Sequence, residues 1–241
     1  MFEEILKKKE LLDSKRPLPE YTVKSIREKL LLEWTYNSNA IEGNTLTLME
    51  TKVILEGITI GGKTLREHLE VVNHKEAILY IEDIVRNQED FTEWQIKNIH
   101  NLVLKGINDK YAGSYRDQQV FISGAEHTPP EPLMIRGEME AFIRWYHTEG
   151  MKLNPIERAA MVHIIFVGIH PFIDGNGRTS RLLLNLELMK NGYPPVVIRV
   201  ENRQKYYMVL DKAHTTGESE DFIALIGEEV NRTLDLYLKY V

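Results

Sequence analysis

The chain contains no cysteine, and its acidic residues outnumber its basic ones, so that the net charge is -6 at pH 7. The first absence excludes disulfide bonds and thiolate metal sites, although it does not indicate a compartment. The lack of excess positive charge matters because binding to nucleic acid depends on cationic contacts to phosphate. Nucleic acid is therefore not an expected partner.

Long hydrophobic runs are also missing from the sequence. The longest run, at residues 164–169, is far shorter than the roughly 20 residues that span a bilayer. The start of the chain carries mixed charge and indicates a helix, not a basic segment followed by an apolar core. We therefore expect no membrane contact and a cytoplasmic location.

Glycine and proline are sparse and clustered, and most segments between the clusters have apolar residues at helical spacing. In residues 21–36, for example, Val23, Ile26, Leu30 and Trp34 recur every three or four positions. The same pattern predicts helices at residues 1–10, 48–56, 65–87, 92–104, 135–148, 155–169, 179–190, 203–213 and 221–240. The helix at 155–169 is apolar on nearly every face, which is typical of a core helix. The predicted fold class is all-α.

One region, residues 112–132, does not look helical. Residues 120–122 (Val-Phe-Ile) have strand character, and Ser123-Gly124 and three prolines follow them. This pattern predicts a small β-hairpin or an extended flap. We expect one all-α domain at residues 61–241 with this flap, and an N-terminal helical region, residues 1–60, folded onto it.

The most informative segment is residues 170–181, with the sequence HPFIDGNGRTSR. Gly175 and Gly177 allow backbone N–H groups to turn inward, and such groups at a helix start form an anion site that the helix dipole reinforces. Arg178 and Arg181 lie three positions apart, so they share one helix face. Both can bind phosphate oxygens through a bidentate fork.

Two further residues of this segment suit chemistry on a phosphate. Asp174 is a hard oxygen ligand, which suits Mg²⁺ already held partly by phosphates. His170 can accept a proton near neutral pH. Taken alone, a histidine after a core helix or a Gly-Asn-Gly turn is more often structural. Together, these residues indicate activation of a hydroxyl group against a Mg²⁺-bound nucleoside triphosphate.

The segment resembles the signature of the Fic family, HxFx(D/E)GNGRxxR. Fic proteins transfer AMP from ATP to a Ser, Thr or Tyr hydroxyl of a target protein. The resemblance implies that His170 is the general base, that Asp174 binds Mg²⁺ and that ATP is the co-substrate. It also implies the phosphate contacts: Gly175, Asn176 and Gly177 on the α- and β-phosphates, with the Asn176 side chain included, Arg178 on the β-phosphate and Arg181 on the γ-phosphate.

A second motif, at residues 38–44 (SNAIEGN), fits the family's inhibitory pattern (S/T)xxxE(G/N). Ser38 and Glu42 are four positions apart and share a helix face, and Gly43 is a natural helix end. The resemblance implies that Glu42 pairs with Arg181 where the γ-phosphate would bind. Its position before the signature is that of class II members. Related autoinhibited members also remove AMP from modified targets, so the resemblance leaves the dominant direction open.

Residues 113–130 resemble the flap on which Fic proteins dock their targets by β-augmentation. Ile122 would then cover the nucleotide. Residues 182–210 resemble the animal endoplasmic-reticulum Fic enzymes, which implies that Tyr206 and Tyr207 line the adenosine site. His214 stands where those enzymes place an asparagine against adenine.

Other functions remain open. The same fold could transfer UMP, phosphocholine or phosphate, or the chain could be a non-catalytic module that binds proteins through the flap. Gly177 and Arg178 favour AMP transfer over Doc-type phosphorylation, and the intact His170, Asp174 and arginines argue against a binding module. Many relatives dimerise, so the resemblance also implies a homodimer. The target protein is not identified.

Overall fold

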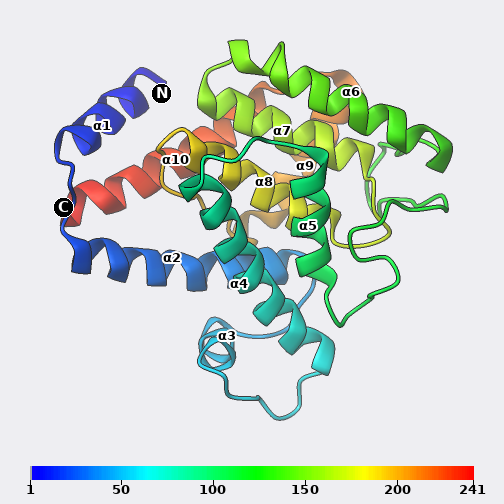
Figure 1. Cartoon of the computed structure of the whole chain (residues 1–241), viewed down its shortest axis with the longest axis horizontal. Helices are drawn as coiled ribbons and strands as arrows, with labels where there is room; N and C mark the ends of the chain where they lie inside the picture. Colours follow the sequence, from blue (N-terminus) through cyan, green and yellow to red (C-terminus); the bar gives the residue numbers. More distant parts are fainter. Residues whose placement is uncertain (1) are drawn as a thin grey trace.

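The structure is a computed structural model that describes residues 2–241, and that part of the chain is helical, with no β-strand (Figure 1). The predicted all-α class is therefore confirmed. The helices are α1 (Phe2–Ser14), α2 (Glu20–Ile41), α3 (Leu48–Leu55), α4 (Leu65–Arg86), α5 (Glu93–Leu104), α6 (Ile135–His147), α7 (Pro155–Ile169), α8 (Asn176–Lys190), α9 (Arg203–Thr216) and α10 (Glu220–Tyr240), with 3₁₀ turns at Pro132–Met134, Gly150–Lys152 and Val200–Asn202.

Local sequence explains most helix boundaries. Thr64 and Glu67 form a capping box at the start of α4, and Asn154 caps α7 just before Pro155. Two of the helices that exceed their predicted bounds do so toward the signature loop. α2 continues to Ile41 and so carries the inhibitory motif to the site, and α8 begins at Asn176, inside the signature.

The centre of the fold is the pair α7 and α8, which pack extensively against each other. In Figure 1, α8 lies at the centre with α4 and α5 crossing in front of it, and both helices contact it. Most residues of α8 from Asn176 to Leu188 are buried. The signature loop that joins α7 to α8 is thus held by the two most buried helices.

The N-terminal region shares this core. α1 packs against α10, and α2 packs against α3, α4, α8 and α10. Ile5 and Trp34 belong to the same buried cluster as the residues of α7 and α8. A domain boundary at residue 60 stays a prediction. No helix of residues 2–241 combines the length and the apolar character needed to cross a membrane.

The predicted β-hairpin is not observed. The flap (residues 112–132) projects beyond the helices at the right of Figure 1, and it turns where the Ala125 N–H donates to the Ile122 carbonyl. Its two limbs are joined by side chains instead of a ladder, because Arg116 and Gln119 donate to carbonyls of the returning limb. That limb contains three prolines, which have no N–H to donate to a sheet.

A buried ion pair joins α7 to α8 behind the signature loop. Arg158 Nε lies 2.6 Å from Glu187 Oε1, and the two side chains are 6% and 0% exposed. Tyr146 Oη donates to Glu187 Oε2 at 2.6 Å, and the Asn191 amide donates to Oε1 at 2.6 Å. Both carboxylate oxygens are therefore satisfied.

Replacing one partner of this pair should be strongly destabilising. Glu187→Leu leaves the Arg158 guanidinium buried without an anion, so we expect the free energy of unfolding to fall by about 3–5 kcal/mol. Urea denaturation followed by circular dichroism measures this change. Glu149→Leu, which breaks the exposed pair with Lys152, is the control and should change stability little. A loss below about 1 kcal/mol in Glu187→Leu would contradict the assignment.

Candidate functional site

The site is built on the N-terminus of α8. Gly175 precedes the helix with φ 78°, a left-handed conformation that favours glycine. The Asn176 side chain accepts from the Phe172 N–H at 3.0 Å and donates to the Phe172 carbonyl at 2.8 Å, so it closes the signature loop on itself. Phe172 is fully buried and anchors the loop. The first-turn N–H groups of α8 are left without helix partners and can bind an anion.

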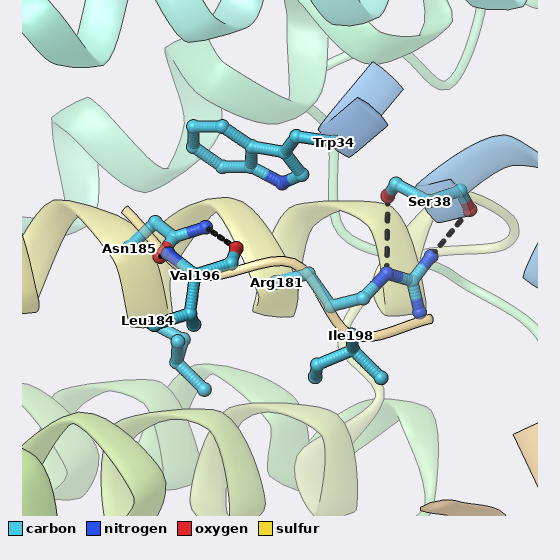
Figure 2. A pocket seen from close by; sticks show the side chains of 7 residues that line it. All are labelled: Trp34, Ser38, Arg181, Leu184, Asn185, Val196 and Ile198. Atoms are coloured by element: carbon cyan, nitrogen blue, oxygen red, sulfur yellow. Dashed lines mark hydrogen bonds between the residues drawn. The ribbon is translucent and has the colours of Figure 1, made fainter. Parts of the chain in front are cut away.

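Arg181 joins α8 to the inhibitory motif on α2. Its Nε donates to Ser38 Oγ at 3.0 Å, and its Nη2 donates to the Ser38 carbonyl at 2.9 Å and to Glu42 Oε1 at 2.7 Å. Figure 2 shows the guanidinium reaching Ser38, with Trp34 packed above. Only a cavity of about 10 Å³ remains beside it, so α2 and α8 hold the side chain closely. The ion pair that the sequence predicts is present.

The Glu42 carboxylate lies against the first turn of α8. A Cβ placed on Gly177 would come within 2.3 Å of Glu42 Oε1, so only glycine permits this approach. Burial alone would lower the pKa of Arg181, but the Glu42 carboxylate holds it above its ordinary value. A carboxylate of the chain itself therefore lies beside Arg181 and the first turn of α8.

A second network surrounds Arg178, which is 2% exposed. Its Nη1 lies 3.1 Å from Glu70 Oε1, and its Nη2 lies 3.3 Å from Asp174 Oδ1. Arg66, on the exposed side, donates to Asp174 Oδ2 at 2.5 Å and to Glu70 Oε1 at 3.1 Å. Burial alone would raise the pKa of Asp174, but Arg178 and Arg66 hold it below its ordinary value. Asp174 is thus an anion held by two arginines.

His170 ends α7 in the left-handed conformation, with φ 49° and ψ 56°. Its Nδ1 lies 3.3 Å from the Val167 carbonyl. A carbonyl only accepts, so this contact places the proton on Nδ1 and leaves the lone pair on Nε2. The pKa of His170 is lowered to about 4, chiefly by burial and also by the Arg116 charge, while the contact with the Val167 carbonyl and the Glu42 carboxylate oppose the shift. His170 is therefore a neutral base at pH 7.

Comparison with known proteins agrees with this arrangement. Residues 90–188 match the sequence profile of the Fic/DOC family. A Fic-domain signaling protein from Bacteroides thetaiotaomicron has the same fold, with a TM-score of 0.90 and 30% identity over 98% of this chain and 96% of that one. The chain belongs to the Fic/DOC family. Fic-1 from C. elegans is similar at a TM-score of 0.88 and 31% identity, covering 98% of this chain and 71% of that one.

Curated Fic sequences give the same result. A protein adenylyltransferase Fic from Nematostella vectensis is 43% identical over 206 residues, which is 84% of this chain and 48% of that protein. One from Culex quinquefasciatus is 39% identical over 98% of this chain and 47% of that protein. The chain spans about half the length of the curated relatives it matches.

Sequence reasoning missed residues that support the Fic loop from other helices. His100, on α5, stacks on Phe172 with ring centroids 3.5 Å apart. Its Nε2 donates to the Asp174 carbonyl at 2.8 Å, and its Nδ1 accepts from the Gly113 N–H at 2.9 Å. Glu70, on α4, was also missed. His100 is a polar residue on an otherwise apolar helix face, which is the signal that could have revealed it, whereas Glu70 lies among other polar residues of α4 and gives no such signal.

The two tyrosines predicted for the adenosine site lie in different surroundings. Tyr206 is 1% exposed, and its Oη lies 2.9 Å from His163 Nε2 and 3.4 Å from Arg181 Nη1. It therefore acts on the site through Arg181. Tyr207 is 39% exposed and donates to the Ile41 carbonyl at 3.2 Å, next to Glu42.

His214 and Ile122 are distant in sequence from the first turn of α8. His214 belongs to α9, and Ile122 belongs to the flap. His214 Nε2 lies 2.9 Å from the Ile164 carbonyl, and its ring is 4.5 Å from that of His127. It lines an open cavity of about 400 Å³ between the flap and α7. Ile122 is half-buried at the flap turn. Contact of either residue with a nucleotide stays a prediction.

The depressed pKa of His170 can be tested directly. We expect its imidazole signal in NMR spectra to titrate with a midpoint near pH 4. In Glu42→Gly the midpoint should fall, because the carboxylate that favours the imidazolium is removed. His170→Asn identifies the signal. A midpoint near the ordinary value of about 6.5 would contradict the buried, neutral base.

Proposed function

We propose that the chain is a protein adenylyltransferase that moves AMP from ATP to a Ser, Thr or Tyr hydroxyl of a target protein and that Glu42 inhibits it. One observation carries this proposal. The Glu42 carboxylate lies on Arg181 and on the first turn of α8, where the Fic signature places phosphate. A protein-borne anion in an anion site is what autoinhibition of a phosphate-binding enzyme requires.

The chemistry follows from His170. Its Nε2 lone pair accepts the proton of the target hydroxyl as that oxygen attacks the α-phosphorus of ATP. The bond from the α-phosphorus to the bridging oxygen of the β-phosphate breaks, and pyrophosphate leaves. The product is AMP esterified to the side chain. Because the pKa of His170 is about 4, the base is in its reactive form across the physiological pH range.

The protein's other groups hold the triphosphate. First-turn N–H groups of α8 bind phosphate oxygens with the help of the helix dipole. Arg178 and Arg181 neutralise the charge that develops on the leaving pyrophosphate. The Asn176 side chain is engaged with Phe172, so its contribution is to keep the loop shape that presents those N–H groups.

The residues present also fit a magnesium ion brought with ATP. Mg²⁺ is commonly held by one or two carboxylates together with phosphates and water. Asp174 supplies one ionised carboxylate beside the phosphate site, and residues 2–241 contain no group of three or more metal-binding side chains. When bound, Mg²⁺ would neutralise phosphate charge. The protein's own step is to release Asp174 Oδ2 from Arg66.

Inhibition would act through Arg181. As long as Glu42 holds the guanidinium, the γ-phosphate cannot take its place, and the α-phosphorus is not aligned with the attacking oxygen. Alignment matters because positioning supplies much of the rate in such transfers. Removal of AMP from a modified target, with Glu42 orienting water, remains a prediction.

The flap is the proposed docking site for the target. Phe121 is 79% exposed at its tip, and the flap presents main chain that no strand of residues 2–241 covers. An extended target segment could pair with it by β-augmentation. A homodimer and a cytoplasmic location also remain proposals. The similarity to relatives named protein adenylyltransferase supports AMP transfer as the proposed activity.

Labelled nucleotides test the function. ATP labelled at the α-phosphate is incubated with cell lysate and wild type, Glu42→Gly or Glu42→Gly/His170→Ala, and label on protein is followed. We expect labelling to rise in Glu42→Gly and to fall by about 10²- to 10⁴-fold when His170 is also replaced.

A matched control separates loss of the carboxylate from loss of helix-end structure. Glu56 is the C-cap of α3 and precedes Gly57, as Glu42 precedes Gly43. Glu56→Gly should leave labelling at the wild-type level. Label from γ-labelled ATP, from UTP or from CDP-choline in place of α-labelled ATP would instead indicate phosphate, UMP or phosphocholine transfer.

Arg66 provides a separate prediction about the metal. Arg66→Gln removes the cation that competes for Asp174, so ATP binding should need less Mg²⁺, by up to about fivefold for a partly exposed pair. Calorimetric titration of ATP at several Mg²⁺ concentrations measures this. Arg86→Gln, which breaks an exposed pair on the same helix, is the control. Weaker ATP binding in Arg66→Gln would mean that Arg66 binds phosphate itself.

A further inference from the structure

A buried arginine stands at the base of the flap. Arg116 is 2% exposed, and its side chain donates to three main-chain carbonyls. Nε reaches the carbonyl of His170 at 2.9 Å, Nη1 reaches that of Gln118 at 2.9 Å, and Nη2 reaches that of Pro130. The backbone N–H of Arg116 donates to the Pro171 carbonyl at 2.9 Å. One residue thus contacts the catalytic turn and both limbs of the flap.

The chemistry of this contact is unusual for a merely structural residue. Buried charges are normally paired, yet within residues 2–241 Arg116 forms no ion pair with a carboxylate. Burial accordingly lowers the pKa of its guanidinium, which stays charged. The planar fork of arginine carries five N–H donors on three nitrogens, so that separate nitrogens can reach three carbonyls that lie apart. What matters at this position is therefore the arrangement of the N–H donors of arginine and not a carboxylate that neutralises its charge.

We propose that Arg116 is a positioning residue that fixes the catalytic base, His170, relative to the flap. A target docked on the flap is thereby held at a fixed position relative to His170. This inference rests on the proposed function. Arg116 holds the peptide units on both sides of Pro171, and the same guanidinium fixes the limb on which the target would lie.

The other attachments of the flap do not reach the base. Asp211, on α9, accepts from the backbone N–H groups of Glu126 and His127 at 3.1 Å. The His127 imidazole contacts the Gly168 carbonyl at 2.8 Å, and the Gln119 amide donates to the Pro129 carbonyl at 3.0 Å. These contacts hold the flap to helices and to itself. The link between flap and His170 main chain runs through Arg116.

Arg116 also shapes the electrostatics of the base. Three charged or titratable groups act on His170: Arg116 at the flap base, Glu42 on α2 and His127 on the flap. Arg116 disfavours the imidazolium, so replacing it by a neutral residue should raise the pKa of His170. The loss of activity at low pH, where His170 becomes protonated, would then begin at a higher pH.

The test compares two flap variants in the uninhibited Glu42→Gly background. Arg116→Lys keeps the charge but not the three-way fork. Gln119→Ala removes the contact with the Pro129 carbonyl and one acceptor of Arg116 Nη1, at 3.3 Å, but leaves the bond from Arg116 Nε to the His170 carbonyl. The probe is label from α-labelled ATP on total lysate protein at increasing protein concentration, which gives a maximal rate and a half-saturating concentration. Binding of ATP without lysate is measured alongside.

We expect Arg116→Lys to lower the maximal rate by about 10- to 100-fold, as misplacement of a reacting group does, with ATP affinity within about twofold of the parent. Gln119→Ala should raise the half-saturating concentration and keep the maximal rate. A maximal rate in Arg116→Lys within about twofold of the parent would overturn the proposal. So would equal loss of rate in both variants.

An NMR measurement keeps the inference separate from the proposed function. In Arg116→Gln, the pKa of the His170 imidazole should rise, and in Gln119→Ala it should not change. This readout needs no transfer activity. If Glu42→Gly with Arg116 intact labels nothing, the proposed function fails, while an unchanged His170 titration in Arg116→Gln sinks the positioning role.

Discussion

The concentration of positive charge at the N-terminus of α8 is the constraint on which the site depends. Arg178 and Arg181 are almost fully buried there, next to N–H groups that have no helix partner. Removing the anion from a buried ion pair is strongly destabilising. In the absence of phosphate, the protein therefore has to supply carboxylates, and Glu70 and Glu42 do so. Any phosphate ligand must compete with the chain's own anions.

These two carboxylates are held differently, and the difference suits different roles. Glu70 lies within α4, its side chain is 9% exposed, and Arg66 and Asn44 also bind it. Glu42 is the C-cap of α2, its side chain is 32% exposed, and Gly43 follows it with φ 97°. Glu42 is thus the more exposed of the two anions and has fewer partners, which suits the proposed release, whereas the position of Glu70 suits a permanent partner of Arg178.

The sequence predicted what local patterns determine. Helical spacing gave helix positions, and the signature places its site residues in one loop, so their proximity follows from chain order alone. Residues brought in from elsewhere could not be predicted in this way. His100 meets the Asp174 carbonyl across 74 positions and Arg66 meets the Asp174 side chain across 108. The hairpin prediction failed for a related reason, because strand propensity at residues 120–122 needs a pairing partner, and the proline-rich return limb offers none.

The backbone conformation of His170 depends both on the local end of α7 and on contacts from residues far away in the sequence. A left-handed histidine is disfavoured by about 1–3 kcal/mol and persists only where its surroundings over-determine it. Here its N–H is bonded to the Phe166 carbonyl, its carbonyl to Arg116 Nε and the next carbonyl to the Arg116 N–H. The turn is needed because α7 must stop abruptly for α8 to begin with its N–H groups facing the site. His170, the start of α8 and the flap therefore meet at one backbone turn.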